Sequence, residues 1–578
     1  MKINSLRNCT YILFFFISGF LFAQKNPPPI KSDSVVVVKP YTPSVHDAFK
    51  IKETPSITDT VDLEKRPVSY SIFSVPVAST FSPAKGRATA VERERPPKLY
   101  DNYISLGFGT YTSILAEFYS NIEVNRTDNF GIFLTHNSAQ GGIEDIYLDD
   151  SYYDTELNLN YSSRGRHMQW DMDFGGEHQL VNWYGLEPLL VGMNYENIDP
   201  QQNYFSAYVG GEVRMEDSFF DRAKAKYRFF GDAEGSMEHR FELKPTLEIP
   251  IGGEIFHTNF VVDYVGGSFD RNYFSEEGID YGFLNAGIES SLLVLRDDLT
   301  LNLGAALYYS HDTQNSDGGL YFYPQVTASY EFAGDYFIGY AGLEGELRQN
   351  SYYGFVQDNP FVSPTLEIQP TDQQYNAYVG AKGKLTNSVG YNIRGSYMAE
   401  DFKPLFRHNV IQPVSNPEDY GHGNSFSVVY DQVKTVSAFG ELSFNVRRNF
   451  DLRLNGEYFI YDTDKEKEAW NLPDYKVNLF ADYQITKNWF AGANLFLVGE
   501  RMDAVQTIGP ADGIELRSVS LDGYFDINAN LGYRFNDRLS IFARGHNLLG
   551  NNYEKWMDYP VLGLQVMAGA TYKFDFGR

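Results

Sequence analysis

Apolar and polar residues alternate with a period of two along most of the chain, and the pattern is clearest near its C-terminal end. In 519–535 the apolar positions include Leu521, Ile527 and Leu531, with polar residues between them. A similar segment follows the turn at 536–537, and another covers 563–575. Such long strands with one apolar face are typical of a closed membrane-spanning barrel, apolar toward lipid and polar toward a wet interior. The alternative is a large soluble β protein, in which shorter strands are usual.

From residue 100 onward the same pattern predicts 22 strands, and counts of 20 to 24 also fit it. The fold class is therefore all-β, a 22-stranded antiparallel transmembrane β-barrel with an extended N-terminal tail. The predicted strands are 103–109, 113–124, 128–138, 153–163, 166–177, 202–213, 220–231, 236–248, 254–268, 279–293, 298–311, 319–332, 335–348, 374–386, 389–401, 425–446, 450–462, 474–485, 488–500, 519–535, 538–549 and 563–575.

Short and long connections alternate along the predicted strands. Turns such as 334–335 and 536–537 alternate with loops at 139–152, 178–201, 349–373, 402–424, 463–473, 501–518 and 550–562. Barrels of the outer membrane have short periplasmic turns and long extracellular loops, so we expect both termini to be periplasmic. Four tryptophans near strand ends or loops are expected to form the interfacial girdle against lipid, namely Trp170, Trp183, Trp489 and Trp556.

The first 98 residues differ from the rest. Residues 1–23 have a basic start, an apolar stretch and a terminal alanine, which predicts a secretory signal peptide. Residues 24–98 are proline-rich and have no sustained period, which predicts an extended or disordered periplasmic or luminal segment. Within it, a short β-prone run either pairs with the edge of another protein's sheet or is a stiff linker, namely Asp33, Ser34, Val35, Val36, Val37 and Val38. Residues 99–578 form the predicted barrel.

Composition excludes several classes of protein. The mean hydropathy is −0.36 although 16% of the residues are aromatic, and no apolar run beyond the N-terminus is long enough for a membrane-spanning helix. Loss of Lys2 and Arg7 with the signal peptide changes the net charge from −27 to about −29. That sign disfavours a nucleic-acid partner. Cys9 lies in the signal peptide, so the predicted mature chain has no thiol.

Few residues suggest chemistry. The chain has no metalloprotease, phosphate-loop or nucleophile-elbow motif, so we expect neither an enzyme nor a cofactor. One acidic run has enough carboxylates to bind Ca²⁺, although such a run is more often a solvated loop and this one lacks the usual Ca²⁺-loop spacing. Its members are Glu144, Asp145, Asp149, Asp150 and Asp154.

The C-terminal segment resembles the closing segment of TonB-dependent receptors. The resemblance rests on the run Ala-Arg-Gly-His-Asn-Leu-Leu-Gly-Asn-Asn-Tyr-Glu at 543–554, on Tyr559-Pro560, and on a last strand that ends in Tyr572-Lys573-Phe574. It implies a 22-stranded barrel over roughly 100–578 in the outer membrane of a Gram-negative bacterium. It also implies that the segment 33–38 is similar to the TonB box, which adds a strand to TonB.

The chain departs from that family in one respect. Family members carry a globular plug of more than a hundred residues, whereas 24–97 is too short and too rich in proline to form one. Something else should then close so wide a lumen: the N-terminal segment, an inward-folded loop such as 349–373 or 402–424, or a partner protein.

Three functional hypotheses follow from these patterns. The first is a plugless conduit, passive or gated by a partner such as TonB. The second is a scaffold subunit of an outer-membrane assembly or secretion complex, with periplasmic or outer-membrane subunits as partners. The third, a barrel enzyme or adhesin, has no motif in its support. Outer-membrane lipid surrounds the barrel in all three.

Overall fold

The computed structural model describes most of the chain after residue 97. The described residues are 98–186, 197–216, 218–251, 254–412, 417–447, 449–508 and 514–576. The predicted signal peptide, the proline-rich segment and the TonB-box-like run at 33–38 lie outside them, so they remain predictions.

One closed antiparallel sheet of 22 strands forms the barrel. Its strands are β1 (Asn102–Gly109), β2 (Ile114–Glu123), β3 (Asp128–Ala139), β4 (Tyr152–Arg164), β5 (Met168–Asn182), β6 (Gln201–Met215), β7 (Phe220–Asp232), β8 (Met237–Ile251), β9 (Glu254–Phe269), β10 (Ile279–Arg296), β11 (Leu299–Asp312), β12 (Asp317–Glu331), β13 (Ile338–Arg348), β14 (Thr371–Thr386), β15 (Val389–His408), β16 (Phe426–Arg447), β17 (Phe450–Thr463), β18 (Tyr475–Gln484), β19 (Trp489–Val498), β22 (Tyr524–Arg534), β23 (Leu539–His546) and β26 (Gln565–Phe574).

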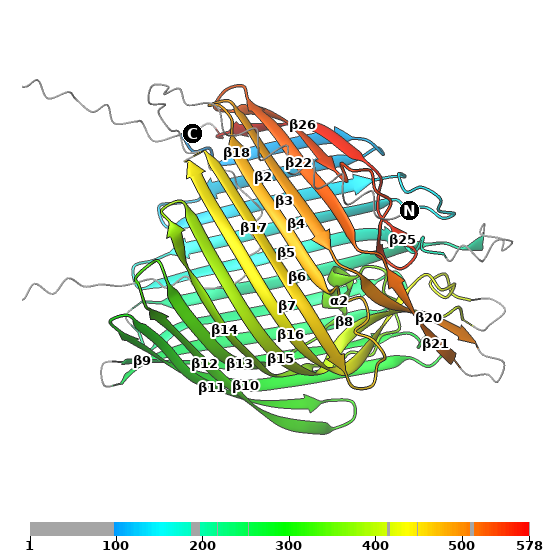
Figure 1. Ribbon diagram of the computed structural model, residues 1–578, viewed down its shortest axis with the longest axis horizontal. Helices are drawn as coiled ribbons and strands as arrows, with labels where there is room; N and C mark the ends of the chain where they lie inside the picture. The colour runs from blue at the N-terminus through cyan, green and yellow to red at the C-terminus, as the bar shows by residue number, and fades with distance from the viewer. Residues whose placement is uncertain are drawn as a thin grey trace, which may run out of the picture. The chain divides into compact units, whose positions relative to one another are not determined.

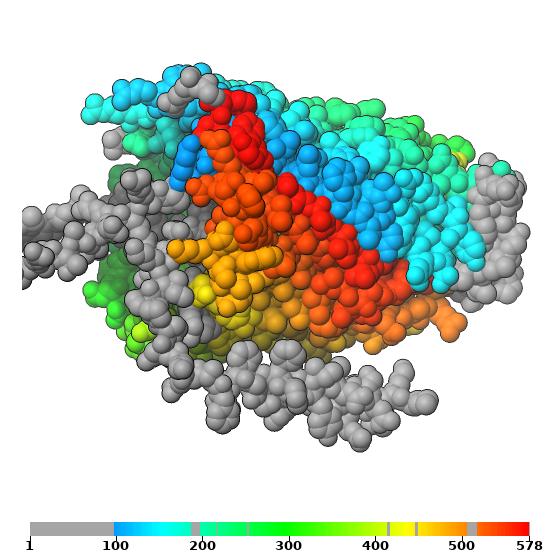
Figure 2. All heavy atoms as spheres, turned by 90° about the horizontal axis from the view of Figure 1, so that it is seen from above, coloured from blue at the N-terminus to red at the C-terminus, as the bar shows by residue number. Residues whose placement is uncertain are grey.

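The sheet closes where the last strand meets the first. β1 pairs with β2 on one side and with β26 on the other, from Asn102 opposite Phe574 to Gly109 opposite Met567. Figures 1 and 2 show the red C-terminal strands beside the blue N-terminal ones. Closure pairs the backbone groups that an open edge would leave in lipid. The predicted fold class and strand count are therefore confirmed.

Alternation along each strand separates the two faces of the barrel. On β7, Tyr227 and Phe229 are exposed on the outer surface, whereas Arg228 and Phe230 face the interior. The outer face thus supplies the apolar surface that lipid requires, and the polar residues line the interior. Among the described residues, no helix has the length and apolar character needed to cross a bilayer.

The connections differ between the two ends of the barrel. One end has short turns, such as 165–167, 387–388 and 535–538. The long connections lie at the other end, which we call the long-loop end, at 140–151, 183–200, 349–370, 409–425, 464–474, 499–523 and 547–564. Figure 1 shows the accessory elements α2, β20, β21 and β25 gathered at one end of the barrel.

The structure corrects the boundaries of several predicted strands. β5 and β15 run on to Asn182 and His408, into the predicted loops 178–201 and 402–424. The segment 519–535 is two elements, because β21 (Ile514–Leu521) pairs with β20 (Arg501–Ile508) in a separate hairpin and the barrel resumes at β22. Gly523 separates them, and a Cβ there would stand 2.8 Å from the carbonyl oxygen of Val498. Only glycine allows this close approach. A small hairpin of β24 (Glu554–Trp556) and β25 (Tyr559–Pro560) lies within the predicted loop 550–562.

Candidate functional site at the long-loop end of the barrel

The connection 349–370 between β13 and β14, which we call the cap, carries the helix α2 (Tyr352–Asp358). Ser351 has an extended backbone, and its side chain accepts a hydrogen bond from the Gly354 N–H at 3.0 Å, so it acts as the N-cap. Tyr352, Phe355 and Val356 are buried, and their spacing of three and four residues places them on one face of the helix. This apolar face requires a partner surface.

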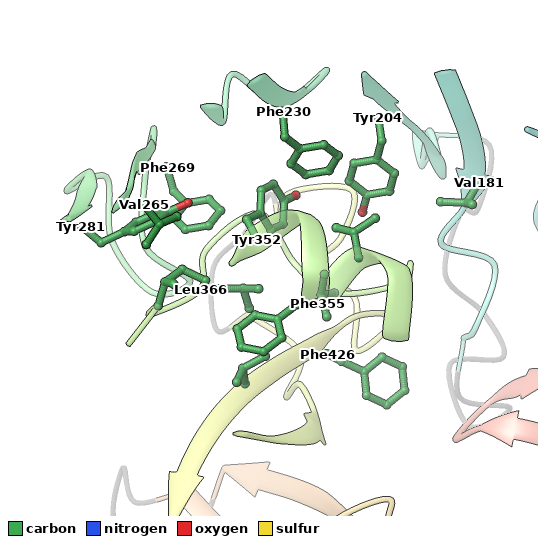
Figure 3. Close-up of a cluster of buried hydrophobic side chains, with 14 of the residues drawn as sticks. Val181, Tyr204, Phe230, Val265, Phe269, Tyr281, Tyr352, Phe355, Leu366 and Phe426 are labelled. Atoms are coloured by element: carbon green, nitrogen blue, oxygen red, sulfur yellow. The ribbon is translucent and has the colours of Figure 1, made fainter. Parts of the chain in front are cut away.

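The interior wall of the barrel supplies that surface. Tyr352 is fully buried, and its ring makes edge-to-face contacts with Phe269 on β9 and Phe230 on β7, at centroid distances of 4.9 and 5.1 Å. Tyr204 on β6 completes the aromatic group, and Figure 3 shows these rings around α2. Aromatic pairs in this geometry are worth about 0.5–1.5 kcal/mol each beyond their buried area. The cap is therefore a packed element inside the barrel.

Two wall carboxylates fix the start of the helix. Glu238 on β8, which is 1% exposed, accepts hydrogen bonds from the Tyr352 N–H at 2.6 Å and the Tyr353 N–H at 3.2 Å, and from the Tyr281 hydroxyl at 2.8 Å. Asp232 accepts the Tyr352 hydroxyl at 2.7 Å. A carboxylate at a helix N-terminus pairs with N–H groups that have no partner within the helix.

The other side of the cap packs against β16 and the loops beside it. Val362, Leu366 and Ile368 belong to the same buried cluster as Phe426 on β16. The backbones also pair, with the Ser363 N–H donating to the Phe426 carbonyl at 2.9 Å. The cap thus bridges the interior wall at β6–β9 and the end of β16.

The β24–β25 hairpin completes this cluster. The Tyr559 ring stacks on Phe361 of the cap at a centroid distance of 3.9 Å, and its hydroxyl donates to the Asn424 carbonyl at 2.5 Å. Trp556 packs on Phe426 in the same core, and Trp183 is fully buried against Tyr420. The prediction of a lipid-interface girdle is therefore wrong for Trp183 and Trp556, because both lie in loops that fold onto one another.

A second cluster anchors the β20–β21 hairpin. Trp470, Leu405, Val433 and Ala504 are buried together. Asp503 on β20 is also fully buried and accepts hydrogen bonds from the His408 N–H, the Asn471 side chain and the Ala504 N–H. Burial raises the pKa of Asp503 to about 6 even though these hydrogen bonds favour its ionised form.

Comparison with known families identifies the barrel. The family model described as TonB dependent receptor-like, beta-barrel matches residues 100–548. The chain belongs to this family. The receptor-like barrel is accordingly an outer-membrane β-barrel protein of the transport class. A comparison with curated protein sequences finds no match.

Solved structures of similar fold include receptors and transporters from several bacteria. The siderophore receptor PirA from Acinetobacter baumannii has a TM-score of 0.61 at 12% identity, covering 82% of this chain and 80% of its own. The FrpB iron transporter from Neisseria meningitidis has a TM-score of 0.62 at 10% identity, covering 82% of both chains. The ferripyoverdine receptor of Pseudomonas aeruginosa has a TM-score of 0.60 at 13% identity, covering 83% of this chain and 73% of its own. At these identities the likeness establishes the fold.

The acidic run 144–154 of the receptor-like barrel makes local contacts. Asp150 accepts the Ile143 N–H at 2.9 Å, and Asp149 accepts both the N–H and the hydroxyl of Ser151 at 3.0 Å. Asp154 lies in β4, and Glu144 and Asp145 lie in the turn before it. Over the described ranges, no three His, Cys, Asp or Glu side chains are grouped closely enough to hold a metal ion. The local contacts give no support to calcium binding by these five residues, which stays a prediction from the sequence.

The loops of the receptor-like barrel are expected to respond to pH through Glu234, in the turn between β7 and β8. Burial, then the charges of Asp232, Asp419 and neighbouring carboxylates, raises its pKa to about 7. The pKa of Glu234 in the folded loop exceeds that of a free Glu, about 4.3. Protonated Glu234 therefore stabilises the loop fully below about pH 4.3, and this stabilisation is lost as the pH rises through about 7. Hydrogen exchange of the turn 233–236 should accelerate from pH 6 to about pH 8, after correction for intrinsic exchange.

Glu234→Gln provides the control for this prediction. An uncharged amide cannot titrate, so the corrected exchange rate of the turn should then be the same at both pH values. A wild-type rate that does not change with pH would contradict the proposed role of Glu234.

Proposed function

We propose that this receptor-like barrel is a conduit for a solute across the outer membrane and that the cap is its gate. The observation that carries the proposal is the position of α2, whose buried Tyr352 packs on interior-facing rings of β6, β7 and β9. A 22-stranded barrel encloses a lumen that is wide enough to leak unless it is filled. The cap supplies a closing element of the kind that the sequence predicts where no plug fits.

We place the short turns and both termini in the periplasm and the long-loop end outside the cell. The alternation of short and long connections supports this orientation. A periplasmic partner, with TonB as the first candidate, would then reach the barrel from the side opposite the cap. The neighbours in fold are named as siderophore receptors or iron transporters, so iron chelates are the first solutes to test.

Removal of the cap should open the barrel. Arg348 at the end of β13 pairs directly with Thr371 at the start of β14, so a four-residue Gly-Ser turn can replace 349–370 without a change of register. In planar lipid bilayers the full-length protein should be closed, and this variant should show a conductance at least about tenfold higher, because the lumen loses its packed filling.

A matched control uses another loop. The same turn in place of 140–151 joins Ala139 and Tyr152, which are also paired, and it removes no residue of the cap cluster. That variant should stay closed. If the conductance after cap removal stays at the wild-type level, the gate proposal fails. If this closed barrel also co-purifies with other envelope proteins, the scaffold hypothesis gains support.

A further inference from the structure

The interior face of β7 carries a ladder of basic residues, although the chain has a net charge of −27. Arg222, Lys224, Lys226 and Arg228 alternate with Ala223, Ala225 and Tyr227. Residues two apart on a strand lie roughly 6.7 Å apart, so the four side chains extend over about 20 Å of the wall. Arg228, the last of them, lies against the cap: its guanidinium stacks on the ring of Tyr353 in α2, 3.7 Å from the centroid.

Carboxylates neutralise the half of the ladder that is farther from the cap. Arg222 pairs with Asp221 at 3.1 Å, and Lys224 pairs with Glu212 at 3.0 Å. Nearby on β8, Arg240 pairs with Asp263 on β9 at 2.7 Å. These cations have little capacity for a further anion, because each already contacts one.

Lys226 and Arg228 differ, because they contact aromatic rings. The Lys226 ammonium stands 4.5 Å from the centroid of the Tyr208 ring, and Arg228 donates to the Ser206 hydroxyl at 3.2 Å beside its stacking on Tyr353. Within the described part of the chain, neither has a carboxylate oxygen within 4.0 Å. Asp173 and Glu242 act on Lys226 only at longer range.

We propose that Lys226 and Arg228 form a binding site for the carboxylate or phosphate group of a small anionic solute, directly beneath the cap. Both side chains keep donors that face the interior, and a charge-assisted hydrogen bond to an anion is stronger than a stacking contact at a wet surface. The proposal deepens the conduit function, because the site would lie on the solute's path and beside its gate.

Occupancy of this site would act on the cap. Arg228 must turn toward the anion, which weakens its stacking on Tyr353. The Tyr353 hydroxyl and the Gln357 amide also donate to Glu177 on β5, at 3.3 and 3.2 Å. Glu177 and Arg228 therefore add to the contacts that Glu238, Asp232 and the wall aromatics make with α2. An anion that competes for Arg228 weakens one of these contacts and shifts the equilibrium toward the released helix.

Binding can be measured without any transport assay. Citrate and inorganic phosphate, as separate probes at constant ionic strength, are titrated into full-length protein in detergent by calorimetry. We expect saturable binding of at least one of them, and Lys226→Gln or Arg228→Gln should weaken it about tenfold, the usual effect of losing one charged hydrogen bond. Hydrogen exchange of 352–358 should increase with the bound probe in the wild type and not in these two variants.

Lys224→Gln is the matched control. It removes the same charge from the same face of the same strand, but from a lysine that is already paired, and Glu212 keeps Arg214 as a partner. The affinity of the Lys224→Gln variant for the probe should change by less than about threefold. Heat-modified mobility on gels confirms that each variant is folded. The site is refuted if the wild type binds neither probe saturably or if all three variants bind equally; neither result decides whether cap removal opens the barrel.

Discussion

Replacing Glu238 by alanine is expected to release the cap from the barrel wall while the barrel itself stays folded. The substitution leaves the N–H groups of Tyr352 and Tyr353 and the Tyr281 hydroxyl without their acceptor in a buried site. A buried polar group without a partner costs about 1–3 kcal/mol, so the closed cap should lose at least about 3 kcal/mol. The released fraction then rises by roughly two orders of magnitude, which hydrogen exchange of 349–370 measures directly.

Two further variants sharpen this test. Glu238→Gln keeps one carbonyl oxygen as an acceptor, so part of the protection should remain. Glu242→Ala, on the same strand and face, removes a carboxylate whose side chain is 45% exposed and pairs with Arg240, and it should leave the cap protected. Unchanged exchange in Glu238→Ala would show that the aromatic contacts of Tyr352 hold the cap by themselves.

The barrel could be predicted from the sequence because the information is local. Each strand is recognisable from its own alternation of apolar and polar residues, and the turn residues between strands set the order of pairing. The boundary error at 519–535 arose because Val519 and Leu521 continue the period of two into β22 although they belong to the β20–β21 hairpin. Periodicity cannot distinguish a barrel strand from a hairpin strand that packs on loops.

The cap could not be predicted in detail, because its contacts are long-range. Tyr352 is 114 residues from Glu238 and 120 from Asp232 along the chain. With only three buried apolar residues, α2 is too short for a periodic pattern, although Ser351 before an apolar pair is a weak helix-start signal. The long connections in the sequence predict that a loop such as 349–373 or 402–424 folds inward, and α2 lies in the first of these.

The basic ladder of β7 shows the opposite case, in which the pattern was visible but its meaning was not. Arg222, Lys224, Lys226 and Arg228 stand at alternate positions in the sequence. Their separation into paired and unpaired cations depends on Glu212, Tyr208 and Tyr353, which come from other strands or from the cap. Only the folded chain assigns these partners.

Replacing Trp470 by alanine is expected to detach the β20–β21 hairpin from the long-loop end. Trp470 is fully buried against Leu405, Val433 and Ala504, and its indole N–H donates to Glu466 at 2.7 Å. Truncation of a buried tryptophan costs about 3–5 kcal/mol, because the cavity cannot fully collapse. A barrel sheet with this many pairings can withstand that loss, so the effect should be confined to the loops.

Limited proteolysis and hydrogen exchange of 501–521 measure this detachment, and Trp489→Ala is the matched control. Trp489 lies at the short-turn end of β19 and is 42% exposed, so its loss removes no contact of the hairpin. Detachment would also expose Asp503, and its pKa should fall from about 6 toward its ordinary value because burial is what raises it. Equal protection of 501–521 in both variants would mean that the hydrogen bonds of Asp503, and not the packing of Trp470, hold the hairpin in place.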